Sequence, residues 1–140
     1  MSTTARLVLE TVSGTGLRFR AEAASGRTST FDSGPEARVL NPVEALVAAL
    51  GACQGMDVIS ILRKQRQDVA GYEIEVVAER RPEHPRALTQ VAIVHRLRGR
   101  DLRPAAIEEA IRLSAEKYCS VTASLAKDVP VVSRYEITPA

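Results

Sequence analysis

The feature that most constrains the fold is a long uncharged stretch that follows a helix-start signal. Asn41 can accept a hydrogen bond at an N-cap, Pro42 suits the first helical position, and Glu44 can reach back to the cap. Residues 45–56 carry no charge, and apolar side chains occupy every side of their helical wheel. The pattern predicts a long central helix that is buried on all sides and closes at Gly71.

Two glycines interrupt this predicted helix beside a cysteine. Gly51 and Gly55 each weaken a helix by about 1 kcal/mol relative to alanine, so their presence calls for a packing reason. Their four-residue spacing places them on one face. We therefore expect another backbone or a ligand to approach closely beside Cys53.

Alternating segments on both sides of the helix predict strands, and a second apolar periodicity predicts another helix. Strands are expected at 6–12, 17–22 and 27–31, at 72–79 and 88–98 as a hairpin, and at 130–137. A helix should begin at Pro104, end near Cys119 and bury one face, and Ser120 should cap a short helix after it. The residues of that buried face are Ile107, Ala110, Ile111, Ser114 and Tyr118. The predicted class is α+β, in the order β-β-β-α-β-β-α-α-β, as one domain over residues 1–140.

Composition and charge narrow the classes of partner. The chain is 45% hydrophobic and 26% charged, as in ordinary globular proteins, and its net charge of +2 is too small to gather nucleic acid or anionic lipid. The start of the chain shows no secretory signal, so a cytoplasmic location is expected. The apolar stretch 45–62 contains Gln54, Asp57 and Ser60, which favour a core helix over a membrane span. We expect neither nucleic acid nor membrane as a partner.

The two cysteines, Cys53 and Cys119, are the main candidates for chemistry. Cys53 alone could be a small packing residue in an apolar helix, whereas Cys119 lies near a predicted helix N-terminus that could activate its thiol. Together they suit a peroxidatic and a resolving thiol, because the sulfenic acid left by peroxide attack over-oxidises unless a second thiol condenses with it. In a reducing cytoplasm their disulfide should be transient.

Other polar residues have structural interpretations of at least equal weight. His84, His95 and the cysteines lack the short spacings of a tetrahedral metal site, so neither a metal nor a cofactor is expected. Glu44 fits helix capping and a catalytic role equally well. The arginines that recur at every second position of a predicted strand indicate a solvated face; they are Arg96, Arg98 and Arg100.

Two segments resemble one protein family. Residues 41–53, followed by Asp57 and Val58, are similar to the first-cysteine helix of the OsmC/Ohr family of thiol-dependent peroxidases, and residues 110–121 are similar to its second-cysteine segment. The likeness is greatest to the YhfA-like branch, through residues 58–62 and 99–102. The organic-hydroperoxide branch has an acid where this chain has Val43 and an arginine where it has the turn Gly14-Thr15-Gly16.

The resemblance implies an OsmC-like fold in an intertwined homodimer, with central helices packed together and active sites at the interface. It implies an oxidoreductase of the oxidative stress response in which Cys53 attacks an organic hydroperoxide, Cys119 resolves the product and Glu44 supports the site. A dithiol of lipoyl or thioredoxin type would be the reductant. Two alternatives remain open: a non-enzymatic dimer that binds a small apolar or electrophilic ligand, and a cysteine-based redox sensor.

Overall fold

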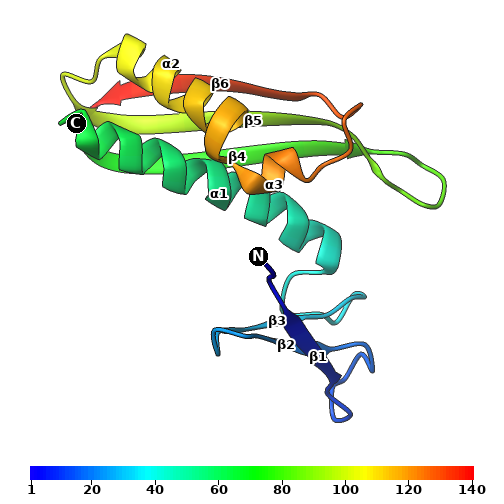
Figure 1. Cartoon of the computed structure of the whole chain (residues 1–140). Helices are drawn as coiled ribbons and strands as arrows, with labels where there is room; N and C mark the ends of the chain where they lie inside the picture. Colours follow the sequence, from blue (N-terminus) through cyan, green and yellow to red (C-terminus); the bar gives the residue numbers. More distant parts are fainter. The chain divides into compact units, whose positions relative to one another are not determined.

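The computed structural model describes residues 1–140 and divides into two compact units, Met1–Leu46 and Val47–Ala140. Along the chain the elements are β1 (Ala5–Leu9), β2 (Phe19–Ala23), β3 (Thr28–Phe31), α1 (Pro42–Lys64), β4 (Asp68–Arg80), β5 (Leu88–Arg100), α2 (Pro104–Leu113), the π-helix η1 (Ser114–Tyr118), α3 (Ser120–Ala123) and β6 (Val131–Pro139) (Figure 1). The predicted α+β class and element order are confirmed, with η1 as an addition. The single OsmC-like domain stays a prediction.

The first unit is built on an antiparallel sheet in the order β1-β2-β3. Its loops are held by Asp32, a buried carboxylate that accepts hydrogen bonds from Thr15 Oγ1 (2.5 Å), Ser33 N (2.8 Å) and Arg18 Nε (3.3 Å). Within this unit, mainly apolar side chains line a cavity of about 600 Å³; the apolar ones are Leu7, Leu17, Phe19, Phe31, Pro42, Ala45 and Leu46.

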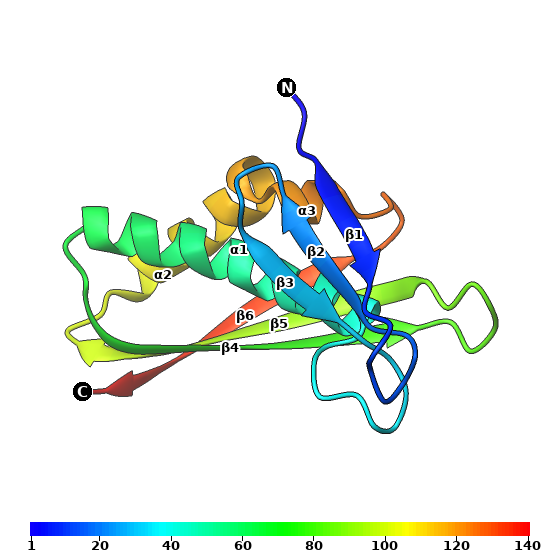
Figure 2. The same cartoon turned by 90° about the horizontal axis from the view of Figure 1, so that it is seen from below.

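The second unit is a three-stranded sheet covered by helices. β4 and β5 form the predicted hairpin, and β6 joins β5 in parallel. The Val47–Lys64 part of α1 and the whole of α2 lie on one face of this sheet (Figure 2). On the other face Arg96 forms ion pairs with Glu73 (3.5 Å), Glu75 (3.3 Å) and Glu136 (3.1 Å). The predicted solvated strand face is therefore confirmed at Arg96.

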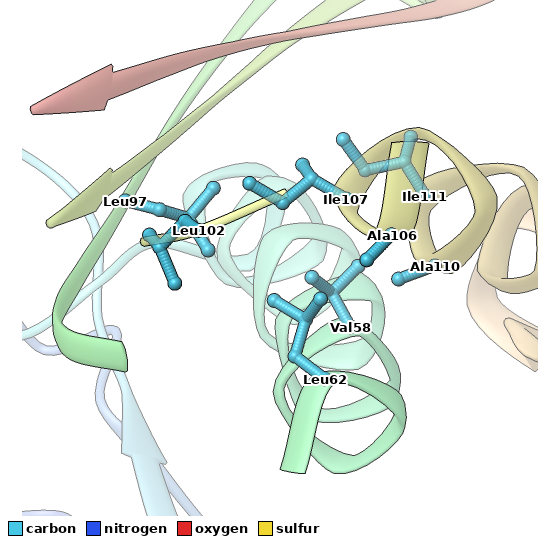
Figure 3. Close-up of a cluster of buried hydrophobic side chains, with 8 residues drawn as sticks. All are labelled: Val58, Leu62, Leu97, Leu102, Ala106, Ile107, Ala110 and Ile111. Atoms are coloured by element: carbon cyan, nitrogen blue, oxygen red, sulfur yellow. The ribbon is translucent and has the colours of Figure 1, made fainter. Parts of the chain in front are cut away.

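Two clusters of buried side chains fill the space between helices and sheet. The first, which we call the apolar cluster, joins α1, β5, the loop after it and α2 (Figure 3); its members are Val58, Leu62, Leu97, Leu102, Ala106, Ile107, Ala110 and Ile111. The second, the cysteine cluster, has a buried centre of Leu50, Val91, Ile93 and Cys119, with Cys53 among the partly buried residues packed against it. Both clusters use the same face of α1.

Helix α1 departs from its prediction in length and burial. It ends at Lys64, because Arg66 adopts a left-handed backbone with φ 56°, and Gly71 instead lies inside β4 at a register shift. Only one stripe of α1 is buried in this chain: Leu50, Gly51, Gln54, Gly55, Val58 and Leu62. Ala52 and Met56 are exposed, so burial on all sides is wrong for the single chain.

The length and apolar composition of α1 are also those of a membrane span. Both properties are shared by core helices of soluble proteins, and the buried stripe of α1 belongs to the core of the second unit.

The two glycines of α1 face the sheet. A Cβ atom on Gly51 would lie 2.9 Å from Val76 Cγ2, and one on Gly55 would lie 2.5 Å from Ile74 Cδ1. Both distances are too short for real carbon atoms, so the helix approaches β4 only because these positions lack side chains. The prediction that another backbone or a ligand lies beside these glycines is therefore wrong, because side chains of β4 occupy that space.

The segment that carries the second cysteine is less regular than predicted. α2 gives way at Ser114 to a π-helical turn, in which Cys119 N donates to Ser114 O over 2.8 Å. The wider turn keeps Ser114 buried but carries Tyr118 off the apolar face, so that Tyr118 is 50% exposed. Its predicted burial is wrong. The N-cap of α3 is Cys119 rather than Ser120.

Candidate functional site

The fold brings the two cysteines together although 66 positions separate them in the sequence. Cys53 lies within α1, and Cys119 lies between η1 and α3. Their Sγ atoms and a carboxylate oxygen of Asp57 all lie within 4.8 Å of one another. Both cysteines are free thiols; Cys53 is half-buried, whereas Cys119 is only 4% exposed. Asp57 follows Cys53 by one helical turn and thus shares its face of α1.

A directed chain of hydrogen bonds ends on the sulfur of Cys119. Ser133 Oγ donates to Gln54 Oε1 (3.5 Å), and Gln54 Nε2 donates to Thr122 Oγ1 (3.1 Å). Because Thr122 Oγ1 accepts from Gln54, its own proton is available for Cys119 Sγ at 3.0 Å; Thr122 N donates to the same sulfur at 3.3 Å. Two donors of one residue therefore converge on the Cys119 sulfur.

Cys53 has a different electrostatic setting. Burial raises the pKa of its thiol, the hydrogen bond and charge of Cys119 and the charge of Asp57 act in the same direction, and the backbone N–H of Val121 opposes them. Within the single chain Cys53 is therefore a neutral thiol near pH 7, and its proton must leave when the sulfur attacks.

Ser114 joins the carboxylate to the second cysteine. Its side-chain Oγ donates to Asp57 Oδ2 over 2.8 Å, while its backbone oxygen accepts from Cys119 N. Asp57 forms no ion pair with any arginine, lysine or histidine of the chain. The site therefore holds two thiols and a carboxylate without a neighbouring cation.

Glu44 belongs to the first unit, where it caps α1. Asn41 N donates to Glu44 Oε1 (3.0 Å), and Glu44 N donates to Asn41 Oδ1 (2.8 Å), which confirms the reciprocal capping box. A catalytic role for Glu44 stays a prediction.

Neither histidine joins the cysteines. His95 is fully buried, with its Nδ1 2.6 Å from the Tyr72 hydroxyl, and His84 lies in an exposed connection.

Sequence reasoning missed four residues of the site, namely Gln54, Asp57, Ser114 and Thr122. Asp57 carried a usable signal, because a charge four residues after Cys53 in an apolar helix must lie on the same helical face. The other three are brought in by tertiary contacts. The prediction of no metal rested on cysteine and histidine spacing and did not weigh Asp57.

Comparisons with known proteins identify relatives of this chain. A family model described as OsmC-like protein matches residues 34–134. Protein YhfA of Escherichia coli strain K12 is 42% identical over 125 residues, which cover 89% of this chain and 93% of YhfA. A structure of a hypothetical protein from Aquifex aeolicus is 29% identical, with a TM-score of 0.85 and coverage of 100% of this chain and 98% of that one. The organic hydroperoxide resistance protein OhrB of Bacillus subtilis shares the fold, with a TM-score of 0.60 at 16% identity and coverage of 97% and 98%.

Proposed function

Because this chain belongs to the OsmC-like protein family, we propose that it is a thiol-dependent peroxidase that reduces organic hydroperoxides through Cys53 and Cys119. The observation that carries the proposal is the meeting of two sequence-distant free thiols in one partly accessible cluster. Fold relatives named for organic hydroperoxide resistance support the choice of substrate class. Cytoplasmic defence against oxidative stress is the corresponding role.

The unequal exposure of the two cysteines assigns the first step to Cys53. A hydroperoxide can reach the half-buried Cys53, whereas Cys119 is almost fully covered. The Cys53 thiol gives up its proton as its sulfur attacks the outer peroxide oxygen, the O–O bond breaks, and the alkoxide takes a proton and leaves as an alcohol. Sulfur is oxidised to a sulfenic acid, and the Val121 N–H stabilises the thiolate that attacks.

Cys119 then completes the oxidation. Its sulfur attacks the sulfenic sulfur, an S–S bond forms, and the hydroxyl group leaves with a proton as water. The buried position of Cys119 protects it from direct reaction with peroxide. The two thiols of the reduced protein therefore supply both electrons of the peroxide reduction.

An external dithiol of lipoyl or thioredoxin type resets the pair. Its thiolate attacks the more accessible Cys53 sulfur, so Cys119 is the leaving group. The two hydrogen bonds from Thr122 stabilise the departing Cys119 thiolate and favour this direction of attack. The second thiol of the reductant then releases Cys53 and becomes a disulfide.

We further propose a homodimer in which the exposed face of α1 packs against a second copy. That face carries Ala52 and Met56, and Met56 is 69% exposed in the single chain. Apolar surface of this kind on a central helix is typical of a subunit interface. Glu44, besides capping α1, would orient an arginine there.

Anaerobic peroxide titration tests the proposed function. The reduced protein is mixed with cumene hydroperoxide or hydrogen peroxide, free thiols are counted, and disulfides are mapped. Wild type should lose two thiols per chain, faster with the organic peroxide, and form a Cys53–Cys119 bond. Cys119→Ser should accumulate a sulfenic acid on Cys53, and Cys53→Ser should not react. Asp128→Asn, an exposed change outside the site, serves as the control.

Survival of both thiols for minutes in stoichiometric peroxide would overturn the peroxidase. A ligand-binding protein would then fit better, and the apolar cavity of the first unit is where a small apolar ligand would be sought. A single rapid oxidation with very slow reset by every dithiol would instead favour a redox sensor.

A further inference from the structure

We propose that reduced Cys53 and Cys119 form, together with Asp57, a binding site for one divalent zinc-class cation. The three side chains offer two thiolate sulfurs and one carboxylate oxygen, all within 4.8 Å of one another. Thiolates select Zn²⁺ over hard cations such as Mg²⁺, and zinc accepts a carboxylate as a further ligand. The metal site uses the two thiols of the proposed peroxidase, but its existence does not depend on peroxide turnover.

The spacing of the ligand atoms suits a tetrahedral ion. Zn–S bonds of about 2.3 Å and a Zn–O bond of about 2.1 Å place ligand atoms about 3.5–3.8 Å apart in tetrahedral geometry. The observed limit of 4.8 Å therefore requires a contraction of about 1.3 Å at most, which side-chain rotation can supply. Cys53 and Asp57 lie one turn apart on a rigid helix, and only Cys119 comes from another segment.

The charge of the cluster favours a cation. Ionisation of both thiols would place three negative charges in one half-buried space, and no basic side chain of the chain forms an ion pair with Asp57. Buried like charges repel strongly unless a counter-charge lies between them. A divalent ion would supply two positive charges at the point where the three ligands meet.

Two of the three ligand atoms are already held by a neighbouring donor. Thr122 donates to Cys119 Sγ, and Ser114 donates to Asp57 Oδ2 at 2.8 Å. Supporting hydrogen bonds of this kind orient ligands in metal sites. A tetrahedral zinc ion with three protein ligands would take water as its fourth ligand.

Metal binding and disulfide formation exclude each other. Each thiol that binds the cation releases its proton to solvent, and the disulfide removes both sulfurs as ligands. The oxidised protein should therefore bind no zinc at this site, and reduction of the disulfide should restore binding.

Metal titration of the full-length, fully reduced, metal-free protein tests the site. Co²⁺ should bind at one ion per chain with the near-ultraviolet absorption of thiolate–cobalt charge transfer, and Zn²⁺ should displace it. Cys53→Ser and Cys119→Ser should weaken that absorption and lower affinity at least tenfold. Asp57→Asn should also lower affinity at least tenfold, whereas Asp128→Asn should leave it unchanged. Ser114→Ala removes the hydrogen bond to Asp57 and should lower the affinity for the metal ion about tenfold to a hundredfold.

The proposal is overturned if Co²⁺ binds without thiolate absorption, or if Asp57→Asn binds Zn²⁺ as tightly as Asp128→Asn does. Circular dichroism of each variant separates loss of a ligand from loss of the fold. Zinc binding without peroxide reactivity would refute only the peroxidase, and peroxide reactivity without zinc binding would refute only the metal site.

Discussion

The apolar cluster and the cysteine cluster occupy neighbouring stretches of one helix–sheet interface, yet they differ in what α1 contributes. To the apolar cluster α1 supplies Val58 and Leu62, which carry no hydrogen-bonding group in their side chains. To the cysteine cluster it supplies Leu50, and beside that cluster it adds two polar residues: Gln54, which donates to Thr122, and Asp57, whose carboxylate lies within 4.8 Å of both sulfurs. One face of a single helix therefore contributes purely apolar side chains to the first cluster and polar as well as apolar side chains at the second.

The largest expected effect that separates the two clusters comes from Ile107, a fully buried member of the apolar cluster. Ile107→Ala should lower the free energy of unfolding by about 2–5 kcal/mol, because it removes buried methyl groups and leaves a cavity. Urea unfolding measures the loss, and Val132→Ala, at a position 65% exposed, is the control. The folded variant should keep the wild-type rate of reaction between Cys53 and peroxide. A large change in that rate would show that the clusters are not separable.

His95 lies between the clusters, flanked on β5 by Ile93 of one and Leu97 of the other. Burial lowers the pKa of His95 to about 4. In the unfolded chain His95 takes up a proton near pH 6.5. The contribution of neutral, buried His95 to the free energy of unfolding is therefore complete above pH 6.5 and is lost as the pH falls toward 4. The free energy of unfolding should fall by about 3 kcal/mol over this range. His95→Gln, which stays neutral and can still bond the Tyr72 hydroxyl, should remove this part of the pH dependence in urea titrations. If the free energy of unfolding depended on pH in the same way in wild type and His95→Gln, this role of His95 would be contradicted.

The smallest expected effect concerns the hydrogen bond from Thr122 to Cys119 Sγ. Thr122→Val keeps the shape of the side chain but removes the donor, so the Cys119 thiolate becomes a poorer leaving group. Reduction of the disulfide by a dithiol should slow about tenfold, which corresponds to about 1.4 kcal/mol. Stopped-flow measurements compare it with Thr89→Val, an exposed change on β5. Equal rates would show that Thr122 only packs against the sulfur.

Local sequence signals predicted the fold well wherever local chemistry decides it. The capping box at Asn41 and Glu44, the hairpin of β4 and β5 and the amphipathic α2 all follow from spacing that neighbouring residues alone determine. The end of α1 was missed because Arg66 takes a left-handed conformation that its residue type does not signal. The π-helical turn was missed because a search for helical periodicity assumes a constant number of residues per turn.

The candidate site was predictable only in part. Two cysteines in a fitting chemical pattern could be recognised, but their contact depends on how α1 and the segment around Cys119 pack, which sequence spacing does not give. Ser114 looked like an ordinary polar residue because its partner Asp57 is 57 positions away. Thr122 lies only three positions after Cys119, but its bond to the sulfur depends on Cys119 being the N-cap of α3, whereas Ser120 was the predicted cap. A charge inside an apolar helix, as at Asp57, was the most informative signal that the chain offered.

The five-residue π-helical turn η1 accommodates one residue more than an α-helical turn would, and the helix continues through it. An α-helix rotates by about 100° per residue, and a π-helical turn takes about one residue more than an α-helical turn, so forcing the same residues into regular α geometry would turn everything downstream by nearly that angle. Cys119, which follows η1 directly, would then point away from Cys53. An engineer who idealised this helix would gain regularity and lose the dithiol. Among relatives, retention of the irregular turn would mark those chains that have inherited the chemistry together with the architecture.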